Sequence, residues 1–331
     1  MATPPHRRWL HPRWLTAALL SAVLGAGLGG CGGGGGGDGS APPSTSTTPP
    51  SNPGTLTQEP GAPVMTGDMA TDGANWINYR RAQVGLAQLA HNTMLDTAAQ
   101  GHSNYQRTNN TISHTETAGQ PGFMGAAPGD RIANAGYKLV LPYAYGEVIS
   151  ATSNSSGFYQ AEELITAIYH RFVIFEPLFR DMGTGAAIAS GSNAYAYFTA
   201  DMATSNGYGA SVGKGNVVVY PFSNQTRVPV NFFSDNESPD PVPTQNEVGY
   251  PVSVHADLLS VLTVQSFTIR PHGGAVMAVR LLTKAGDSDT PVSAAAIIPL
   301  SVLASGTTYD VSFSGSVDGI VVNRNWSFTT K

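Results

Sequence analysis

The sequence predicts an α+β domain followed by an all-β domain. Three stretches with helical periodicity come first, and a strand hairpin that turns at Gly191-Ser192-Asn193 follows them. Helices that precede strands favour an α+β arrangement over a parallel sheet. From about residue 215 to residue 331 the chain changes to short strands separated by turns, which predicts a β-sandwich.

The helical stretches are residues 74–89, 92–108 and 159–172. Asn92 is placed to cap the second of them. That helix carries an inward face at the i, i+3, i+4, i+7 and i+10 positions, formed by Leu95, Ala98, Ala99, His102 and Tyr105. We therefore expect His102 to be a buried, hydrogen-bonded core histidine.

The third helix has an apolar stripe and a histidine beside it. His170 lies next to that stripe, and we expect it near the C-terminal end of the helix, where a cation is favoured. The stripe is formed by Leu164, Ala167, Ile168 and Phe172.

The C-terminal part contains eight short strand segments. In chain order they are NVVVYPF, TRVPVNFF, YPVSVHA, SFTIRP, AVMAVRLLT, AAAIIPL, TTYDVSFSG and NRNWSFTT.

Length and charge narrow the functional classes. The chain has 331 residues, of which 41% are hydrophobic, and this is enough for two domains. The net charge is −5, only 12% of the residues are charged, and no basic block follows Arg13. This balance argues against a nucleic-acid partner. The single cysteine, Cys31, excludes an internal disulfide.

Residues 1–30 have the pattern of a bacterial export signal. Arg7, Arg8 and Arg13 precede the apolar run LTAALLSAVLGAGLGG, which is short for a membrane span. The next residue is Cys31, and LGGC resembles a lipobox, which implies cleavage before Cys31 and lipidation of its thiol. The alternative is an ordinary signal peptide with an incidental cysteine, but the position directly after the apolar run favours the lipobox. Gly32, rather than an aspartate, favours the outer membrane by analogy.

The sequence divides into four parts. After the lipoprotein signal peptide at 1–30, residues 31–68 are rich in Gly, Ser, Thr and Pro and are typical of a flexible tether. The α+β domain is expected at 69–206 and the all-β domain at 215–331.

Four segments of the α+β domain are similar, in order and spacing, to one protein family. They are NYRRAQVGLAQLAHNTMLDTAAQGHSNY, then SHTETAGQPGF with GDRIANAGY, then GEVIS, then HRFVIFEPLFRDMGTG with YAYFTADM. Together they resemble the bacterial branch of the CAP superfamily, the SCP-like domains related to cysteine-rich secretory proteins. The resemblance implies an α–β–α sandwich with a central antiparallel sheet and a cleft that gathers His and Glu side chains. The closing segment, LASGTTYDVSFSGSVDGIVVNRNWSFTTK, resembles bacterial Ig-like modules and implies an Ig-like β-sandwich.

The CAP pattern implies three cleft residues in this chain. They are His114 in the SH pair, Glu147 in the GE pair and His170 in the HR pair. Animal members carry a further histidine where this chain has Tyr197, so one ligand of their four-residue metal site is missing. Glu116 is close enough in sequence to join or orient His114.

Two imidazoles and one carboxylate can bind Zn²⁺ or a similar divalent ion, or they can perform acid–base chemistry. Each residue also has a structural interpretation. His114 can cap the turn that follows it, Glu147 can pair with Arg131 or Arg171, and His170 can serve as a cation at a helix end. The glycine before Glu147 favours the cleft interpretation for that residue.

No sharper enzyme motif accompanies these candidates. The sequence has no G-x-S-x-G, no H-E-x-x-H, no P-loop and no dinucleotide fingerprint. We therefore expect a non-enzymatic binding module, anchored to the cell envelope by lipidated Cys31, whose His/Glu cleft binds a small molecule, a lipid, a glycan or a divalent ion. The alternatives are a hydrolase with His114 or His170 as general base beside Glu147, and a structural or adhesion protein.

Overall fold

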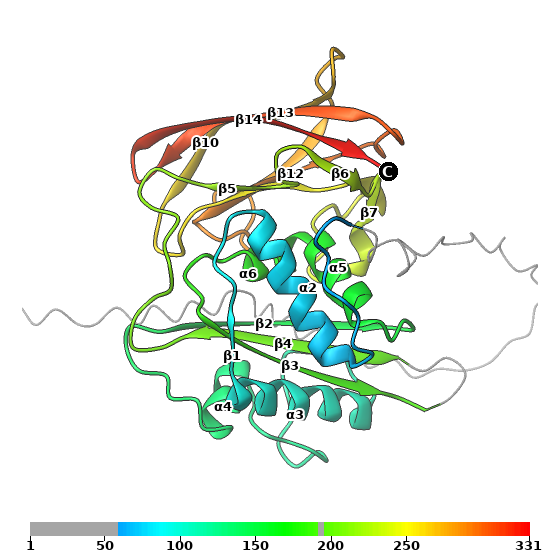
Figure 1. The fold of residues 1–331 in the computed structure, drawn as a ribbon, viewed down its shortest axis with the longest axis vertical. Coiled ribbons are helices and arrows are strands. Elements are labelled where there is room, and N and C mark those ends of the chain that lie inside the picture. The colour runs from blue at the N-terminus through cyan, green and yellow to red at the C-terminus, as the bar shows by residue number, and fades with distance from the viewer. Residues whose placement is uncertain (1–58, 191–194) are drawn as a thin grey trace, which may run out of the picture.

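The computed structural model describes residues 59–190 and 195–331. The predicted signal peptide, the lipobox at Cys31 and most of the predicted tether lie outside these residues. The described chain forms two lobes, shown in Figure 1. The N-terminal lobe holds the elements from α2 to β4, and the C-terminal lobe holds those from β5 to β14.

The N-terminal lobe is built around one four-stranded sheet in the order β1-β3-β4-β2. The pairings β3–β4 and β2–β4 are antiparallel, while the short β1 pairs with β3 in parallel. The strands are β1 (Ala90–His91), β2 (Ala144–Thr152), β3 (Asp181–Ile188) and β4 (Ala196–Thr204). The predicted hairpin is thus present as β3 and β4, although its turn falls outside the described residues.

Helices cover both faces of this sheet, so the lobe is the predicted α–β–α sandwich (Figure 1). One face carries α3 (Thr93–Asn109) and α4 (Pro128–Asn134). The other face carries α2 (Met69–Gln83), α5 (Gly157–Thr166) and α6 (Ile168–Ile174).

The helix α3 packs closely on β3 because that strand presents two glycines to it. A Cβ atom at Gly183 would come within 2.1 Å of the Asp96 nitrogen, and one at Gly185 within 2.2 Å of the Gln100 nitrogen. The helix begins as predicted, since the Asn92 side chain accepts hydrogen bonds from Met94 N and Leu95 N. The whole predicted inward face is buried, including His102 with 0% exposure.

The third predicted helix differs from the expectation. It is broken at Ala167, which has extended backbone angles (φ −67°, ψ 120°), so α5 ends before it and α6 begins after it. His170 therefore lies in the first turn of α6 and not near a helix C-terminus. Periodicity alone missed the break because both short helices bury apolar residues.

The C-terminal lobe consists mainly of two four-stranded sheets in the orders β10-β13-β14-β6 and β11-β12-β9-β5. Each of the eight predicted strand segments contributes to the lobe. The strands are β5 (Val218–Tyr220), β6 (Gln225–Val228), β7 (Asn231–Phe233), β8 (Glu247–Gly249), β9 (Val252–His255), β10 (Leu262–Pro271), β11 (Val279–Thr283), β12 (Ala294–Pro299), β13 (Thr308–Val317) and β14 (Ile320–Thr330). β7 and β8 form a separate two-stranded sheet. A 3-10 turn at Ser234–Asn236 follows β7 along the chain.

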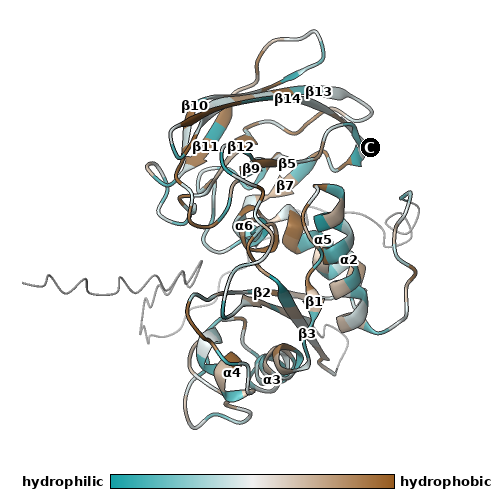
Figure 2. Ribbon diagram, turned by 60° about the vertical axis from the view of Figure 1, so that its left-hand side comes forward, coloured by the Kyte–Doolittle hydropathy of each residue, from teal (hydrophilic) through white to brown (hydrophobic). Residues whose placement is uncertain are grey.

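The two lobes share hydrophobic contacts. Phe175, which follows α6, lies with its ring centroid 5.1 Å from that of Tyr220 in β5. The Arg171 guanidinium lies 4.8 Å from the Tyr220 ring and donates to Pro251 O at 2.7 Å. α6 lies between the sheet of the N-terminal lobe and the C-terminal lobe (Figure 2). One hydrophobic cluster contains buried side chains from both lobes.

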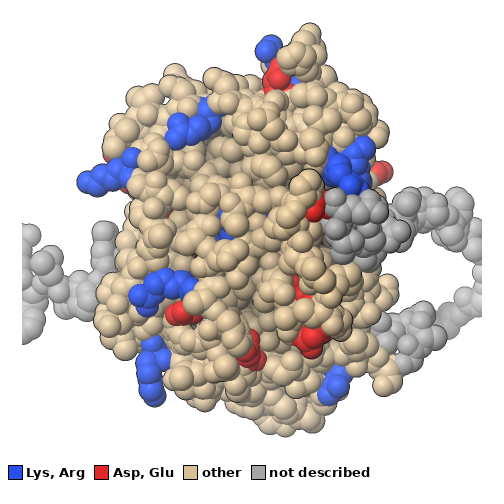
Figure 3. Space-filling view, viewed as in Figure 1, with Lys and Arg blue, Asp and Glu red and all other residues tan. Residues whose placement is uncertain are grey.

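The end of the predicted tether is held against α2. Glu59 pairs with Arg80 at 2.6 Å, and the Tyr79 hydroxyl donates to Pro60 O at 2.9 Å. In Figure 3 the visible face of the molecule carries few charged side chains, in keeping with the low charged fraction. No helix in the described ranges is both long enough and apolar enough to span a membrane.

Candidate functional site

A cluster of buried charges lies between the sheet of the N-terminal lobe and the helices α3 and α4. Glu147 on β2 is at its centre. The preceding residue, Gly146, faces α6, because a Cβ there would meet Val173 at 2.6 Å. Side chains alternate along a strand, so Glu147 faces the opposite side, toward α3 and α4.

Arg131 and His114 bind the two oxygens of Glu147. Arg131 Nη2 lies 2.8 and 2.7 Å from the two oxygens, and His114 Nδ1 lies 2.8 Å from Oε1. Burial alone would raise the pKa of Glu147, but the charges of His102 and Arg131 and the His114 bond outweigh it and hold this pKa well below its usual range. Glu147 is therefore a buried carboxylate anion.

His114 is the partly exposed member of this cluster. Its side chain is 25% exposed, whereas the Glu147 side chain is 1% exposed. An ionised carboxylate only accepts hydrogen bonds, so His114 Nδ1 carries the hydrogen that points to Glu147. In the neutral ring, Nε2 then holds a lone pair, and it makes no hydrogen bond to any residue that the structure describes.

A second histidine–glutamate pair supports the loop that carries His114. His102 Nδ1 lies 2.9 Å from Glu116 Oε1, and His102 Nε2 lies 2.9 Å from Ser113 O. The other oxygen of Glu116 accepts from Met124 N at 2.7 Å. Both side chains are buried. Through Ser113 and Met124 this pair ties α3 to the chain before and after Glu116.

Residues 74–202 match the model of the CAP family, which is described as the cysteine-rich secretory protein family. Residues 74–202 are a CAP domain. No curated protein matches the chain.

Two solved structures are similar to part of the chain. One is an extracellular protein containing a SCP domain from Bacillus anthracis str. Ames, with 21% identity, a TM-score of 0.33, and coverage of 47% of this chain and 44% of that one. The other is an outer surface protein from Borrelia burgdorferi, with 15% identity, a TM-score of 0.35, and coverage of 43% of this chain and 97% of that one. The chain thus spans less than half the length of the first of these proteins.

The CAP domain brings together two of the three residues that the sequence placed in the cleft. His114 and Glu147 are in contact, but His170 is not with them. His170 Nδ1 lies 2.9 Å from Glu237 Oε1, in the C-terminal lobe, and α6 packs on the sheet face opposite to α3 and α4. The sheet therefore separates His170 from the His114–Glu147 pair.

Glu116 and Tyr197 also occupy defined places in the CAP domain. Glu116 binds His102 and not His114. Asp201 in β4 lies directly across from Glu147. Tyr197 lies on the same face of β4, four residues before Asp201. At the usual rise along a strand this is roughly 13 Å, so Tyr197 is not a neighbour of Glu147 in the sheet.

The donor atoms of this cluster do not fit a three-ligand metal site. Arg131 and His114 occupy both oxygens of Glu147, and both nitrogens of His102 have partners. Among the histidine nitrogens and Glu147 oxygens of this cluster, only His114 Nε2 has no partner in the described residues. No group of three or more His, Cys, Asp or Glu side chains within the described residues is arranged to hold an ion.

Asp201 is a residue of the site that the sequence interpretation missed. It is 0% exposed, lies directly across from Glu147 in the sheet, and neither of its oxygens has a hydrogen-bond partner among the described residues. Burial and the Glu147 charge raise the pKa of Asp201 well above its usual value, so it is the neutral member of the carboxyl pair. The alternation along the strand places Asp201 on the same face as Tyr197 and Thr199, but it does not tell which residue lies across from it.

Proposed function

We propose that this chain is an exported, lipid-anchored protein of the bacterial envelope whose CAP domain binds a small hydroxyl-bearing ligand at His114. The observation that carries the proposal is the 2.8 Å contact between His114 Nδ1 and Glu147, combined with the partial exposure of the His114 ring. The N-terminal pattern that ends at Cys31 supports export and anchoring.

The direction of the His114–Glu147 hydrogen bond selects the chemistry of the ligand. Since Glu147 accepts the Nδ1 hydrogen, neutral His114 offers Nε2 as a hydrogen-bond acceptor. A ligand with a hydroxyl group can donate to it, as sugars, glycerol headgroups and lipid alcohols can. Arg131 is fully buried and engaged by Glu147, so it supplies no open site for an anion.

The test uses an amphiphile that carries sugar hydroxyls and one that lacks them. We would titrate the full chain with octyl glucoside below its micelle concentration and follow the His114 ring signals by NMR, with octyltrimethylammonium as the matched amphiphile. The proposal expects saturable shifts with the glucoside alone, and loss of this binding in His114→Ala. His91→Ala, an exposed histidine of the same domain, is the control and retains the binding. Equal shifts with both amphiphiles would contradict the proposal.

A hydrolase is the second candidate, because Glu147 orients the His114 ring in the way a general base requires. No side-chain hydroxyl or thiol of the described residues hydrogen-bonds to this ring, so the nucleophile would be water. This candidate expects turnover of p-nitrophenyl acetate by the full chain that is lost in His114→Ala and kept in His91→Ala. Equal residual turnover in all three proteins would identify it as contamination.

A further inference from the structure

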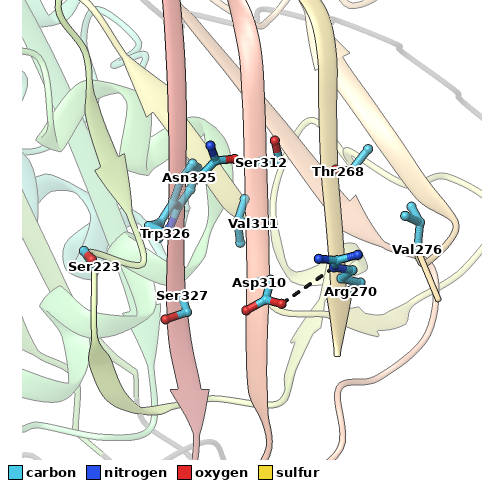
Figure 4. Close-up of a pocket in the computed structure, with 10 residues that line it drawn as sticks. All are labelled: Ser223, Thr268, Arg270, Val276, Asp310, Val311, Ser312, Asn325, Trp326 and Ser327. Atoms are coloured by element: carbon cyan, nitrogen blue, oxygen red, sulfur yellow. Dashed lines mark ion pairs between the residues drawn. The ribbon is translucent and has the colours of Figure 1, made fainter. Parts of the chain in front are cut away.

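A groove on the C-terminal lobe lies far from the residues discussed so far. It has a volume of about 670 Å³, within the range of small-molecule sites. Its floor is the outer face of β10, β13 and β14, as Figure 4 shows. Ser223, from the β5–β6 turn, and Val276, from the β10–β11 loop, stand at its two sides.

The floor of the groove consists of two rows of polar side chains that cross three adjacent strands. Strand register aligns Thr268, Ser312 and Asn325 in one row. The same register aligns Arg270, Asp310 and Ser327 in the other. With the usual strand spacing and rise, the rows cover an area of roughly 10 by 7 Å.

Most of these polar groups are uncommitted. The side chains of Ser223, Thr268, Ser312, Asn325 and Ser327 make no hydrogen bond to any residue in the described ranges. The hydroxyls can donate and accept, and the Asn325 amide can do both as well. A ligand bound here would therefore find both hydrogen-bond donors and hydrogen-bond acceptors.

The groove carries no net charge. Its two charged side chains, Arg270 and Asp310, pair with each other at 3.6 Å, and His272 adds a contact to Asp310 at 3.1 Å. A charged ligand would have to break this pairing, whereas a neutral one can use the remaining hydrogen-bonding capacity of both groups.

We propose that this groove binds a neutral oligosaccharide, because a sugar chain presents hydroxyls that each donate and accept. The size of the two rows fits a short stretch of such a chain. A purely solvated sheet face would also be polar, but it would not be bordered on two sides by the Ser223 turn and the Val276 loop.

The test is calorimetric titration of the full chain with chitotriose, maltotriose and cellotriose, and with trigalacturonate as the charged comparator. We expect at least one neutral trimer to bind. Asn325→Ala should weaken that binding about fivefold, the effect of one lost hydrogen bond of ordinary strength. Asn323→Ala is the matched control, because Asn323 lies two residues away on the same outer face of β14, outside the groove, and it should change the affinity less than twofold.

Three results would overturn the proposal: no binding of any neutral trimer at about 10 mM, equal binding of trigalacturonate, or equal losses in the two asparagine variants. The proposal is independent of the His114 site. The two sites are read out separately, because Asn325→Ala reports on the groove whereas the His114 ring signals report on the CAP domain, so failure of one site does not imply failure of the other.

Discussion

The His114 ring depends on how Glu147 is held. Burying a carboxylate is costly unless charged partners and hydrogen bonds compensate it. Here Arg131 contacts both oxygens, and His114 adds a third contact at 2.8 Å. Arg131 in turn depends on Glu147, because its guanidinium is equally buried. The pair is thus a structural support that fixes the position and the tautomer of a partly exposed histidine.

Replacing Glu147 with glutamine should destabilise the protein by about 3 kcal/mol, since it removes the nearer counter-ion of the buried Arg131 and leaves only Glu116, at 3.7 Å, among the described residues. His114→Ala should cost about 1 kcal/mol or less, because that ring is partly exposed. Urea unfolding of both variants measures the difference. A loss below about 0.5 kcal/mol in Glu147→Gln would show that Arg131 does not rely on this carboxylate.

The sequence supported the His114–Glu147 pair only through the family pattern, because the two residues lie 33 positions apart. The same pattern misplaced His170, since the sheet that separates it from Glu147 is a tertiary feature that no local spacing reports. Arg131 was foreseen as one of two partners for Glu147. Asp201 was missed because a lone Asp in an apolar strand gives no sign of which residue lies across from it.

At the scale of elements, a carboxylate from the C-terminal lobe caps a helix of the CAP domain. Glu237 accepts from Ile168 N and Tyr169 N at 2.7 Å each, and from His170 N at 3.2 Å, at the start of α6. These backbone groups lack partners inside the helix, and a negative charge is favoured at that end. The cap explains why α6 can begin after the break at Ala167. The helix pattern could not predict it, because the capping residue lies about 70 positions downstream.

Removing this cap should destabilise the protein and weaken the coupling between the lobes. Glu237→Ala leaves two buried N–H groups, one partly buried N–H group and the His170 ring without their acceptor, so we expect a loss of about 2–4 kcal/mol. Glu247→Ala is the control, because Glu247 is exposed, and it should change stability by less than about 0.5 kcal/mol. Calorimetric unfolding measures both. Equal melting temperatures for the two variants would contradict the capping role.

At the scale of the whole molecule, the lobes meet over apolar side chains and over a second buried acid besides Glu237. Glu176 Oε1 accepts from Leu178 N in its own lobe and from Leu258 N in the other, both at 3.0 Å. Burial raises the pKa of Glu176 to about 8. Periodicity and strand spacing predicted an α+β domain and an all-β domain, but they held no sign of this junction, because the contacts join segments that are about 80 residues apart.

Glu176 makes stability depend on pH. Its folded pKa lies above its unfolded value, so the folded state binds the extra proton, and stability should fall as the pH rises from about 4.5 to about 8. Glu176→Gln keeps the oxygen that accepts both backbone hydrogens and cannot titrate. We expect the variant to gain stability relative to the wild type as the pH rises through this range, as measured by urea unfolding at successive pH values. Parallel curves for the two proteins would show that Glu176 does not titrate in this range.

The central claim is that buried Glu147 fixes His114 with its hydrogen on Nδ1 and its lone pair on Nε2. The most direct measurement is the long-range ¹H–¹⁵N NMR spectrum of the histidine rings in the full chain, with His114→Ala used to assign the signal. The account predicts that the neutral His114 ring shows a protonated Nδ1 and an unprotonated Nε2. A ring protonated at Nε2 in its neutral form would contradict it, because Glu147 would then not be the acceptor that orients the site.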